Sequence, residues 1–161
     1  ILQILGEYQA KATFFCVGEN AERHPQILDQ IKEEGHLLGN HSHQHISGWK
    51  TPVKPYVENV YRASESIKSN LFRPPYGQIN YQQIKALKED YKIIMWSILS
   101  GDFDPKLSQQ QCLFNVLQSK PGDIVVFHDN IKSEEKVHYV LPRYLSHFSN
   151  LGYEFCSLSG N

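Results

Sequence analysis

Short apolar runs alternate along the chain with amphipathic stretches. Six runs of β-branched, aromatic and aliphatic residues have the length and composition of a strand. They cover residues 12–17, 36–40, 71–73, 91–96, 123–127 and 153–158, and the run at 91–96 carries the strongest strand pattern. The sequence therefore predicts six strands.

The segments between these runs carry apolar residues at helical spacing. Ile1, Leu5 and Tyr8 share one helical face, so the chain is expected to begin inside a helix. Pro25 opens a second helix, which closes at Gly35. Further helices are predicted over residues 57–67, 81–89, 108–118 and from 134 to near 152. This alternation predicts an α/β protein with a parallel sheet and right-handed crossovers, either open or closed into a barrel.

Side chains with useful chemistry follow four of the predicted strands. Each lies just beyond the carboxyl end of its own strand: His41, Arg73, Asp102 and His128. In a closed barrel these strand ends form one rim, where barrel active sites are built, whereas an open sheet would spread them along an edge. The arrangement favours a barrel.

Length and composition describe an ordinary globular protein. The chain has 161 residues, of which 40% are hydrophobic and 20% charged, enough for one domain over residues 1–161. The net charge of −1 offers no electrostatic basis for binding nucleic acid or an anionic membrane. No apolar run approaches the roughly 20 residues that span a bilayer. The first residues lack a signal peptide and an initiator Met, so we expect the natural N-terminus upstream, and cell-envelope and cytoplasmic locations both stay open.

The segment 39–45 places three imidazoles directly after a short apolar run. Neutral imidazole is a common ligand of Zn²⁺ and related ions, and His41 and His45, four residues apart, can meet one ion from a tight loop. His43 is expected to point away from them, either toward solvent or as a support. A catalytic ion needs a third protein ligand and an open position for water. The alternative is a histidine-rich surface loop that binds nothing.

His128 leaves a hydrophobic strand and is suited to act as a general acid. A carboxylate behind it, from Asp102 or Asp104, would orient its ring and fix its tautomer. The alternative is a packed histidine with a satisfied hydrogen bond.

Arg73, held by the two prolines after it, is placed to orient a carboxylate or to meet an anionic transition state, although it also reads as a surface arginine. Tyr76 brings a ring and a backbone N–H, which is a natural oxyanion donor. The rings of Trp49, Phe103 and Tyr76 are suited to stack on sugars, whereas Trp96 equally reads as a core residue.

Five motifs in order and spacing resemble the polysaccharide deacetylases of carbohydrate esterase family 4, the NodB homology domain. They are Ala12-Thr13-Phe14-Phe15, Gly39-Asn40-His41-Ser42-His43-Gln44-His45, Arg73-Pro74-Pro75-Tyr76-Gly77, Trp96-Ser97 with Asp102, and Gly122-Asp123-Ile124-Val125-Val126-Phe127-His128-Asp129. The resemblance covers nearly the whole chain.

This resemblance implies a distorted (β/α) barrel that removes N- or O-acetyl groups from chitin-like sugars, peptidoglycan or xylan. It implies a divalent ion, with Zn²⁺ expected first, held by one Asp and two His. By the same resemblance His41 and His45 are metal ligands, Arg73 steadies the catalytic base, Tyr76 supplies the oxyanion donor, Asp102 tunes the acid and His128 is the acid.

Two features depart from the family pattern. The Thr-Phe-Asp-Asp-Gly-Pro type stretch, which carries the base and the third metal ligand, would precede Ile1 and is absent. The chain is therefore expected to lack the first strand and to be inactive or weakly active. Asp102-Phe103-Asp104 stands where many relatives have Asp-Trp, which leaves the partner of His128 open.

The predicted function is that of a metal-dependent hydrolase that removes acetyl groups, chiefly N-acetyl, from a glycan such as peptidoglycan or a chitin-type oligosaccharide. A non-catalytic sugar-binding derivative of the same fold is the alternative, favoured by the missing aspartates. A different metallohydrolase, such as a phosphoesterase, would normally show more clustered carboxylates.

Overall fold

The computed structural model describes residues 1–158 of the chain. The chain folds into two compact units. We call residues 12–95 with 157–158 the sheet unit, and residues 1–11 with 96–156 the helical unit. Among the described residues, no helix combines the length and the apolar character needed to cross a membrane.

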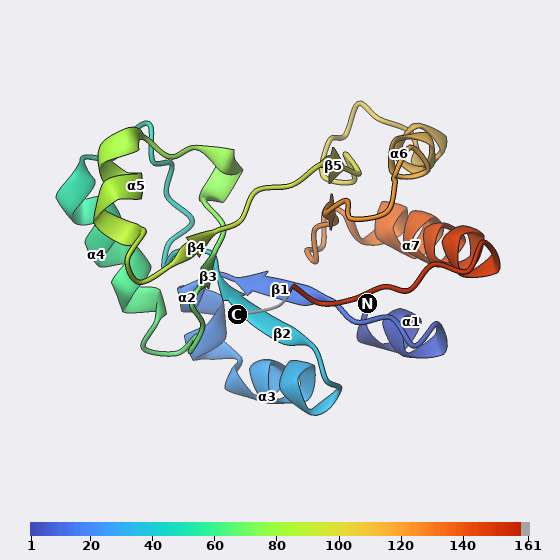
Figure 1. Ribbon diagram of the computed structural model, residues 1–161, viewed down its shortest axis with the longest axis horizontal. Helices are drawn as coiled ribbons and strands as arrows, with labels where there is room; N and C mark the ends of the chain where they lie inside the picture. Colours follow the sequence, from blue (N-terminus) through green and yellow to red (C-terminus); the bar gives the residue numbers. More distant parts are fainter. Residues whose placement is uncertain (159–161) are drawn as a thin grey trace. The chain divides into compact units, whose positions relative to one another are not determined.

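The sheet unit is built on four parallel strands in the order β1-β2-β3-β4 (Figure 1). They are β1 Thr13–Cys16, β2 Leu37–Asn40, β3 Leu71–Phe72 and β4 Lys92–Ile93. β1 and β2 pair over their full length, from Thr13 opposite Leu37 to Cys16 opposite Asn40. Because the strands are parallel, the residues that follow β2 and β3 leave the same edge of the sheet.

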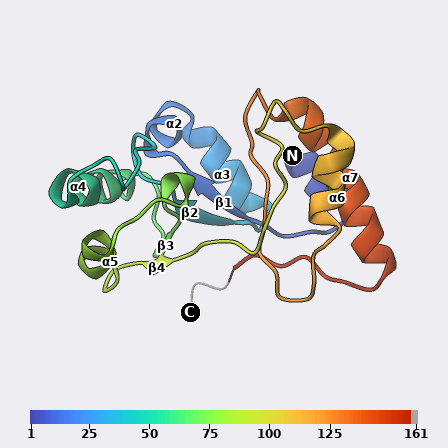
Figure 2. The ribbon, with the colours of Figure 1, turned by 90° about the horizontal axis from the view of Figure 1, so that it is seen from above.

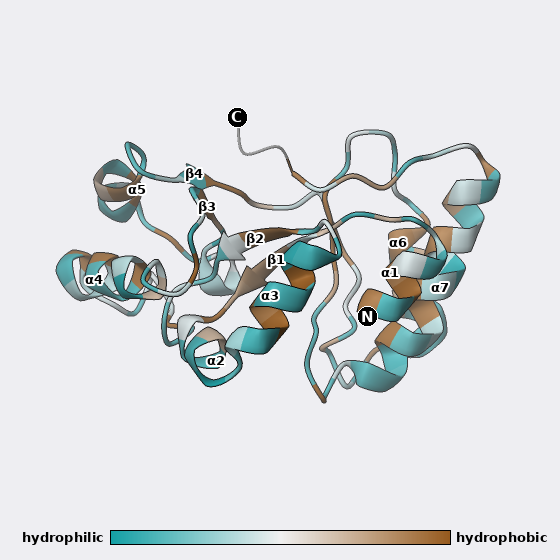
Figure 3. Cartoon of the chain, turned by 90° about the horizontal axis from the view of Figure 1, so that it is seen from below, coloured by the Kyte–Doolittle hydropathy of each residue, from teal (hydrophilic) through white to brown (hydrophobic). Residues whose placement is uncertain are grey.

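Helices connect these strands. They are α2 Gly18–Arg23, α3 Pro25–Glu33, α4 Val53–Ala63, the 3₁₀ turn η1 Pro75–Gly77 and α5 Tyr81–Leu87. α3 packs on β2 through an apolar face, with Leu28 and Ile31 buried three residues apart. The core under α4 and α5 is mostly aromatic and comprises Tyr56, Val60, Phe72, Leu87 and Tyr91. Figure 3 shows hydrophobic residues concentrated on β1 and β2, while α3 and α4 alternate between hydrophobic and hydrophilic residues.

The helical unit contains α1 Leu2–Glu7, β5 Ile98–Leu99, α6 Gln109–Val116, β6 Val125–Val126 and α7 Glu134–Asn150. β5 and β6 form a short parallel pair. α6 lies beside α7 (Figure 2), and the apolar stripe of α7 is buried at positions Val137, Val140, Leu141, Tyr144, Leu145 and Phe148. That spacing of three and four residues is the helical periodicity on which the prediction of this helix rested.

The predicted element order holds for most of the chain, with differences at four places. Residues 153–158 form no strand, because their backbone makes isolated bonds, from Lys11 N to Phe155 O and from Leu158 N to Thr13 Oγ1, in place of a ladder. The run at 91–96 pairs only at Lys92–Ile93, since the next carbonyls accept hydrogen bonds from an arginine side chain. β5 and α2 were missed; in α2 only Gly18 and Ala21 are buried, too few for an apolar stripe.

Candidate active site

The loop after β2 is anchored by a buried asparagine. The Asn40 side chain is fully buried; its Nδ2 donates to the backbone oxygen of Val60 at 2.9 Å, and its Oδ1 accepts the Ser42 N–H at 2.8 Å. The His41 N–H continues the strand by bonding the Cys16 carbonyl at 2.9 Å. These contacts place the His41 side chain at the carboxyl edge of the sheet.

The two predicted metal ligands lie together in this loop. The rings of His41 and His45 have centroids 4.9 Å apart. His41 Nδ1 lies 2.6 Å from the Arg73 carbonyl oxygen, which can only accept, so Nδ1 carries the proton and Nε2 of the neutral ring can serve as an electron-pair donor. A backbone carbonyl on the second ring nitrogen is the usual support of a metal-bound histidine.

Two imidazole donors therefore fit a divalent ion. Within residues 1–158, no group of three or more His, Cys, Asp or Glu side chains is arranged to hold one. Among the described residues, the predicted pair is therefore not joined by a third such side chain in a metal-holding arrangement.

The backbone around this pair is strained. Ser42, His45 and Tyr76 adopt the left-handed conformation, with φ of 61°, 54° and 59°. Only one other non-glycine residue in the described chain, Gln9, does so. Such conformations cost free energy, and they gather at functional sites where the surroundings hold them in place.

His43, which was expected to point toward solvent or to act as a support, does not face solvent. Its side chain is 1% exposed, and its Nδ1 lies 3.7 Å from a carboxylate oxygen of Glu22. Its backbone N–H bonds the side chain of Asn59 at 3.0 Å. His43 therefore packs beneath the loop, and the solvent-facing reading is wrong.

Arg73 is half-buried and bonded to two backbone carbonyls, so the interpretation as a surface arginine is also wrong. Its guanidinium donates to the carbonyls of Ile94 at 3.3 Å and Met95 at 3.0 Å, and its Cζ lies 4.1 Å from the ring centroid of Phe15. Burial lowers the pKa of Arg73 to about 10, which leaves the group protonated at neutral pH. It presents a fixed positive charge beside the histidine loop.

Phe15 was missed as a contributor to this arrangement. Its ring packs across Gly39, where a Cβ would come within 2.5 Å of the ring, and reaches the guanidinium of Arg73. The sequence did contain an indication of this contact. Successive side chains of a strand point to opposite faces, so Phe14 and Phe15 could not both enter one core.

Tyr76 forms the outer wall next to His45. Its ring centroid lies 4.6 Å from that of His45 in an edge contact, and its side chain is 63% exposed. It sits inside η1, the short turn that the two prolines after Arg73 introduce. Its role as a backbone donor to an oxyanion stays a prediction.

The helical unit holds the other predicted pair. Asp102 is fully buried; one carboxylate oxygen accepts the His128 backbone N–H at 2.6 Å, and the other lies 2.7 Å from His128 Nδ1. Asp104 instead accepts the backbone N–H of Lys106. The partner of His128 is therefore Asp102, and the edge of the Phe103 ring lies against His128 with centroids 4.8 Å apart.

The family model for polysaccharide deacetylases matches residues 1–91 of the chain. The chain belongs to the polysaccharide deacetylase family. This match covers the strands and the loop that carry His41, His45, Arg73 and Tyr76.

Curated members of the deacetylase family are similar over most of this chain. A peptidoglycan-N-acetylglucosamine deacetylase of Bacillus cereus is 35% identical over 80% of the chain and 49% of its own length. A second enzyme of that name from the same organism is 29% identical over 99% of the chain and 78% of its own length. The chain thus spans about half of the first of these relatives and most of the second.

Solved deacetylases share the fold. The structure of the Bc1960 peptidoglycan N-acetylglucosamine deacetylase superposes with a TM-score of 0.90 at 30% identity, covering 98% of this chain and 77% of that one. The Xyl-CE4 domain of a xylanase from the hindgut metagenome of Trinervitermes trinervoides superposes at 0.86 with 28% identity, covering 98% and 78%. The predicted α/β fold of the polysaccharide deacetylase type is confirmed.

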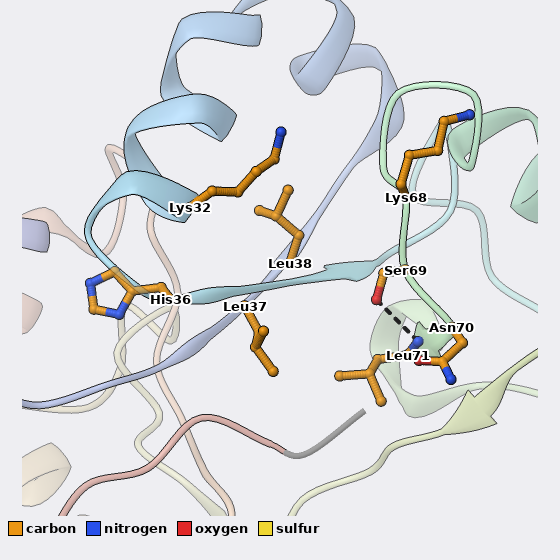
Figure 4. Close-up of a pocket in the computed structure, with 8 residues that line it drawn as sticks. All are labelled: Lys32, His36, Leu37, Leu38, Lys68, Ser69, Asn70 and Leu71. Atoms are coloured by element: carbon orange, nitrogen blue, oxygen red, sulfur yellow. Dashed lines mark hydrogen bonds between the residues drawn. The ribbon is translucent and has the colours of Figure 1, made fainter. Parts of the chain in front are cut away.

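A cavity of about 350 Å³ lies elsewhere in the deacetylase sheet unit (Figure 4). It opens beside the first residues of β2 and β3, Leu37 and Leu71, with Lys32 and Lys68 on its rim. The residues that line it include none of the predicted site residues. Because His41 and Arg73 follow the opposite ends of these strands, the cavity is separate from the histidine loop.

Proposed function

We propose that this protein is a metal-dependent hydrolase that removes N-acetyl groups from an acetylated glycan, with residues 1–161 forming one catalytic domain. The observation that carries the proposal is the pairing of His41 and His45, with Nδ1 of His41 held by the Arg73 carbonyl at 2.6 Å. That bond selects the tautomer that a metal ligand requires. Family membership supports the reaction class.

In this proposal His41 and His45 hold a divalent ion, for which Zn²⁺ is the first choice. When bound, such an ion polarises an acetyl carbonyl and lowers the pKa of water. The Arg73 guanidinium, fixed by Phe15 and two carbonyls, keeps a positive charge beside the pair and can orient a carboxylate base. The Tyr76 N–H donates to the carbonyl oxygen as negative charge develops there.

His128 is the proposed acid. Its Nδ1–H donates to the buried carboxylate of Asp102, which fixes the ring and leaves Nε2 as the atom that gains and releases a proton. Protonated His128 then delivers that proton to the leaving nitrogen of the sugar. Two bonds to one carboxylate, from the ring and from the backbone, restrain the direction in which Nε2 points.

The proposed substrate is an N-acetylated amino sugar within a glycan such as peptidoglycan or a chitin-type oligosaccharide. Both Bacillus cereus relatives are named as peptidoglycan-N-acetylglucosamine deacetylases, which supports amide cleavage. The exposed rings of Trp49 and Phe103 supply surfaces on which a pyranose can stack.

Metal binding tests the proposal without relying on activity. Titration of the chelator-treated protein with Zn²⁺ and Co²⁺, followed by calorimetry and by the visible spectrum of Co²⁺, should show one site that His41→Ala and His45→Ala each abolish or weaken at least tenfold. His138→Ala, on the exposed face of α7, is the matched control and should bind as the parent does. Unchanged stoichiometry and affinity in both loop variants would exclude the pair as ligands.

Acetate release tests the reaction. The full-length protein should release acetate from N-acetylglucosamine oligomers and from peptidoglycan, lose this activity on metal removal, and regain it with Zn²⁺. Acetylxylan tests whether O-acetyl groups are also removed. Binding of the oligomers without acetate release under any metal condition would overturn the enzyme proposal in favour of a sugar-binding protein.

A further inference from the structure

The histidine loop, residues 41–45, follows a course that its own residues do not favour. Ser42 and His45 have positive φ angles of 61° and 54°, a conformation that costs free energy in residues other than glycine. Such a conformation persists only where surrounding groups hold it in place. The relative position of the His41 and His45 rings depends on this course, so the groups that hold the loop also set the geometry of the pair.

A side chain of α4 supplies several of the bonds that hold the loop. Asn59 Oδ1 accepts the backbone N–H groups of both His43 and Gln44, each at 3.0 Å. The Asn59 Nδ2 group donates to the side-chain oxygen of Gln44 at 3.0 Å. Successive backbone N–H groups converge on one acceptor only where the chain turns. The Asn59 amide is therefore matched to the bend in the loop.

The carbonyl groups of the loop are bonded by the first residues of α2. The Gly18 N–H donates to the Ser42 carbonyl at 2.9 Å. The Glu19 N–H donates to the His43 carbonyl at 3.0 Å, and the Glu19 carboxylate accepts the Gln44 side-chain N–H at 3.2 Å. The loop is thus bonded to two helices, through its N–H groups to α4 and through its carbonyls to α2.

Tight packing beneath the loop leaves these bonds little freedom. His43 is 1% exposed, and a Cβ on Gly18 would come within 2.6 Å of its Nδ1 and 3.0 Å of the Ala63 Cα. The His43 ring therefore lies against α2 where that helix meets α4. Packing of this kind fixes the depth of the loop but pairs none of its N–H groups, and an N–H that is covered without a partner costs free energy. Asn59 supplies the acceptor that the packing cannot.

We propose that Asn59 is a positioning residue for the metal site, which sets the course of the histidine loop so that His41 and His45 stand together before an ion binds. The inference rests on the proposed function for the role of the pair as metal ligands. The positioning itself belongs to the metal-free protein. Order that is present before binding raises affinity, because less entropy is lost when the ion is held.

The metal-free protein gives the first test. A nuclear Overhauser effect between the rings of His41 and His45, whose centroids lie 4.9 Å apart, should be present in the parent. It should persist in Asn59→Asp, which keeps an oxygen acceptor, and be lost in Asn59→Leu, which has the same branched shape without a polar atom. Amide exchange at His43 and Gln44 should be about five- to tenfold faster in Asn59→Leu, as expected for the loss of one typical hydrogen bond. A ring contact that survives in Asn59→Leu, or is absent from the parent, would overturn the inference.

Metal affinity is the second test. Asn59→Leu should weaken Zn²⁺ binding about 10- to 100-fold, which is the usual effect of losing a group that orients a metal ligand. Asn59→Asp should restore most of the affinity. The absorption bands of bound Co²⁺ report the geometry around the ion, so they should shift in Asn59→Leu and return toward those of the parent in Asn59→Asp.

Ile31→Ala separates position from stability. Ile31 is 4% exposed on α3, and its carbonyl bonds the His36 N–H at the start of β2, whereas the histidine loop follows the end of that strand. The cavity left by the substitution should lower the urea midpoint of unfolding. Ile31→Ala should nevertheless keep the ring contact and the Zn²⁺ affinity of the parent. Equal losses of affinity in Ile31→Ala and Asn59→Leu would show that Asn59 has a merely structural role.

The two tests also separate this inference from the proposed function. A parent that binds no Zn²⁺ but shows the expected ring contacts in all variants would overturn the metal site and support the positioning of the loop by Asn59. Equal Zn²⁺ affinity in the parent and in Asn59→Leu would overturn the positioning role and leave the proposed function standing.

Discussion

At the scale of single residues, the Asp102 carboxylate is fully buried, and both of its oxygens are bonded by His128. Burial of a charge is costly unless strong hydrogen bonds replace water. Two short bonds do so, and both come from His128. Both oxygens of the Asp102 carboxylate therefore bond His128, which is the arrangement expected if Asp102 orients His128 as the acid.

Asp102→Asn should lower kcat of the proposed deacetylation by about 10² to 10⁴-fold, the range of general acid–base contributions. The amide can turn its N–H toward Nδ1 and so favour the wrong tautomer of His128. Steady-state kinetics with N-acetylglucosamine hexamer as the substrate measure the effect, and urea unfolding checks that the variant is folded. Asp104→Asn is the control, since the Asp104 carboxylate bonds the Lys106 N–H, and an equal loss in both variants would contradict the assignment.

At the scale of elements, two helices begin with a reciprocal cap. Asn80 and Gln83 cap α5, and Ser108 and Gln111 cap α6, with each pair exchanging side-chain and backbone bonds. The spacing of three residues is local, which is why the start of α6 at Ser108 was predictable from the sequence. At α5 the same device also carries the loop around Trp49.

Ser108→Ala should destabilise the protein by about 1 kcal/mol, the typical cost of losing an N-cap side chain. The Gln111 N–H would then lose its acceptor, now 3.2 Å away. Urea unfolding followed by circular dichroism gives the free energy of unfolding. Gln110→Ala, at an exposed position of the same helix, should be neutral or slightly stabilising, because alanine is the better helix former. Identical midpoints for Ser108→Ala and the parent would show that the cap contributes nothing.

At the scale of the whole molecule, several tyrosines resist ionisation. A hydrogen bond to the Asp90 carboxylate, at 2.5 Å, raises the pKa of Tyr61 to about 12. Burial raises the pKa of Tyr56 and of Tyr144. In the unfolded chain these phenols ionise near their ordinary value of about 10.

Stability should therefore fall as the pH rises above about 10. Between that value and about 12 the unfolded chain releases phenolic protons that the folded protein retains, which favours unfolding. Arg73 opposes this loss of stability, because its lowered pKa lets the folded protein release a proton at a lower pH than the unfolded chain does. It is a single group, whereas the three tyrosines Tyr56, Tyr61 and Tyr144 all favour unfolding as the pH rises. Urea midpoints at pH 8, 10 and 11, with absorbance of tyrosinate at 295 nm, measure the trend. Tyr61→Phe should flatten it, and a midpoint that is constant over this range would refute the argument.

Much of the fold was present in local patterns of the sequence. Three of these patterns involve residues within one or two helical turns: the apolar spacing in α7, the proline that opens α3 and the cap of α6. They therefore depend little on the rest of the chain. The order of strands and helices placed His41 and Arg73 after parallel strands, and the motifs identified the family. These features are encoded over short distances along the backbone.

Other features were decided only by contacts between distant segments. Asp102 and Asp104 are equivalent in sequence, and the choice between them comes from a bond across 26 residues. The tautomer of His41 depends on a carbonyl 32 residues away, and the burial of His43 depends on packing against its surroundings. Residues 153–158 have a strand's composition, but they meet the chain at the start of β1 through isolated bonds, from Lys11 N to Phe155 O and from Leu158 N to Thr13 Oγ1. A ladder needs a partner backbone in register, which the fold supplies and not the segment itself.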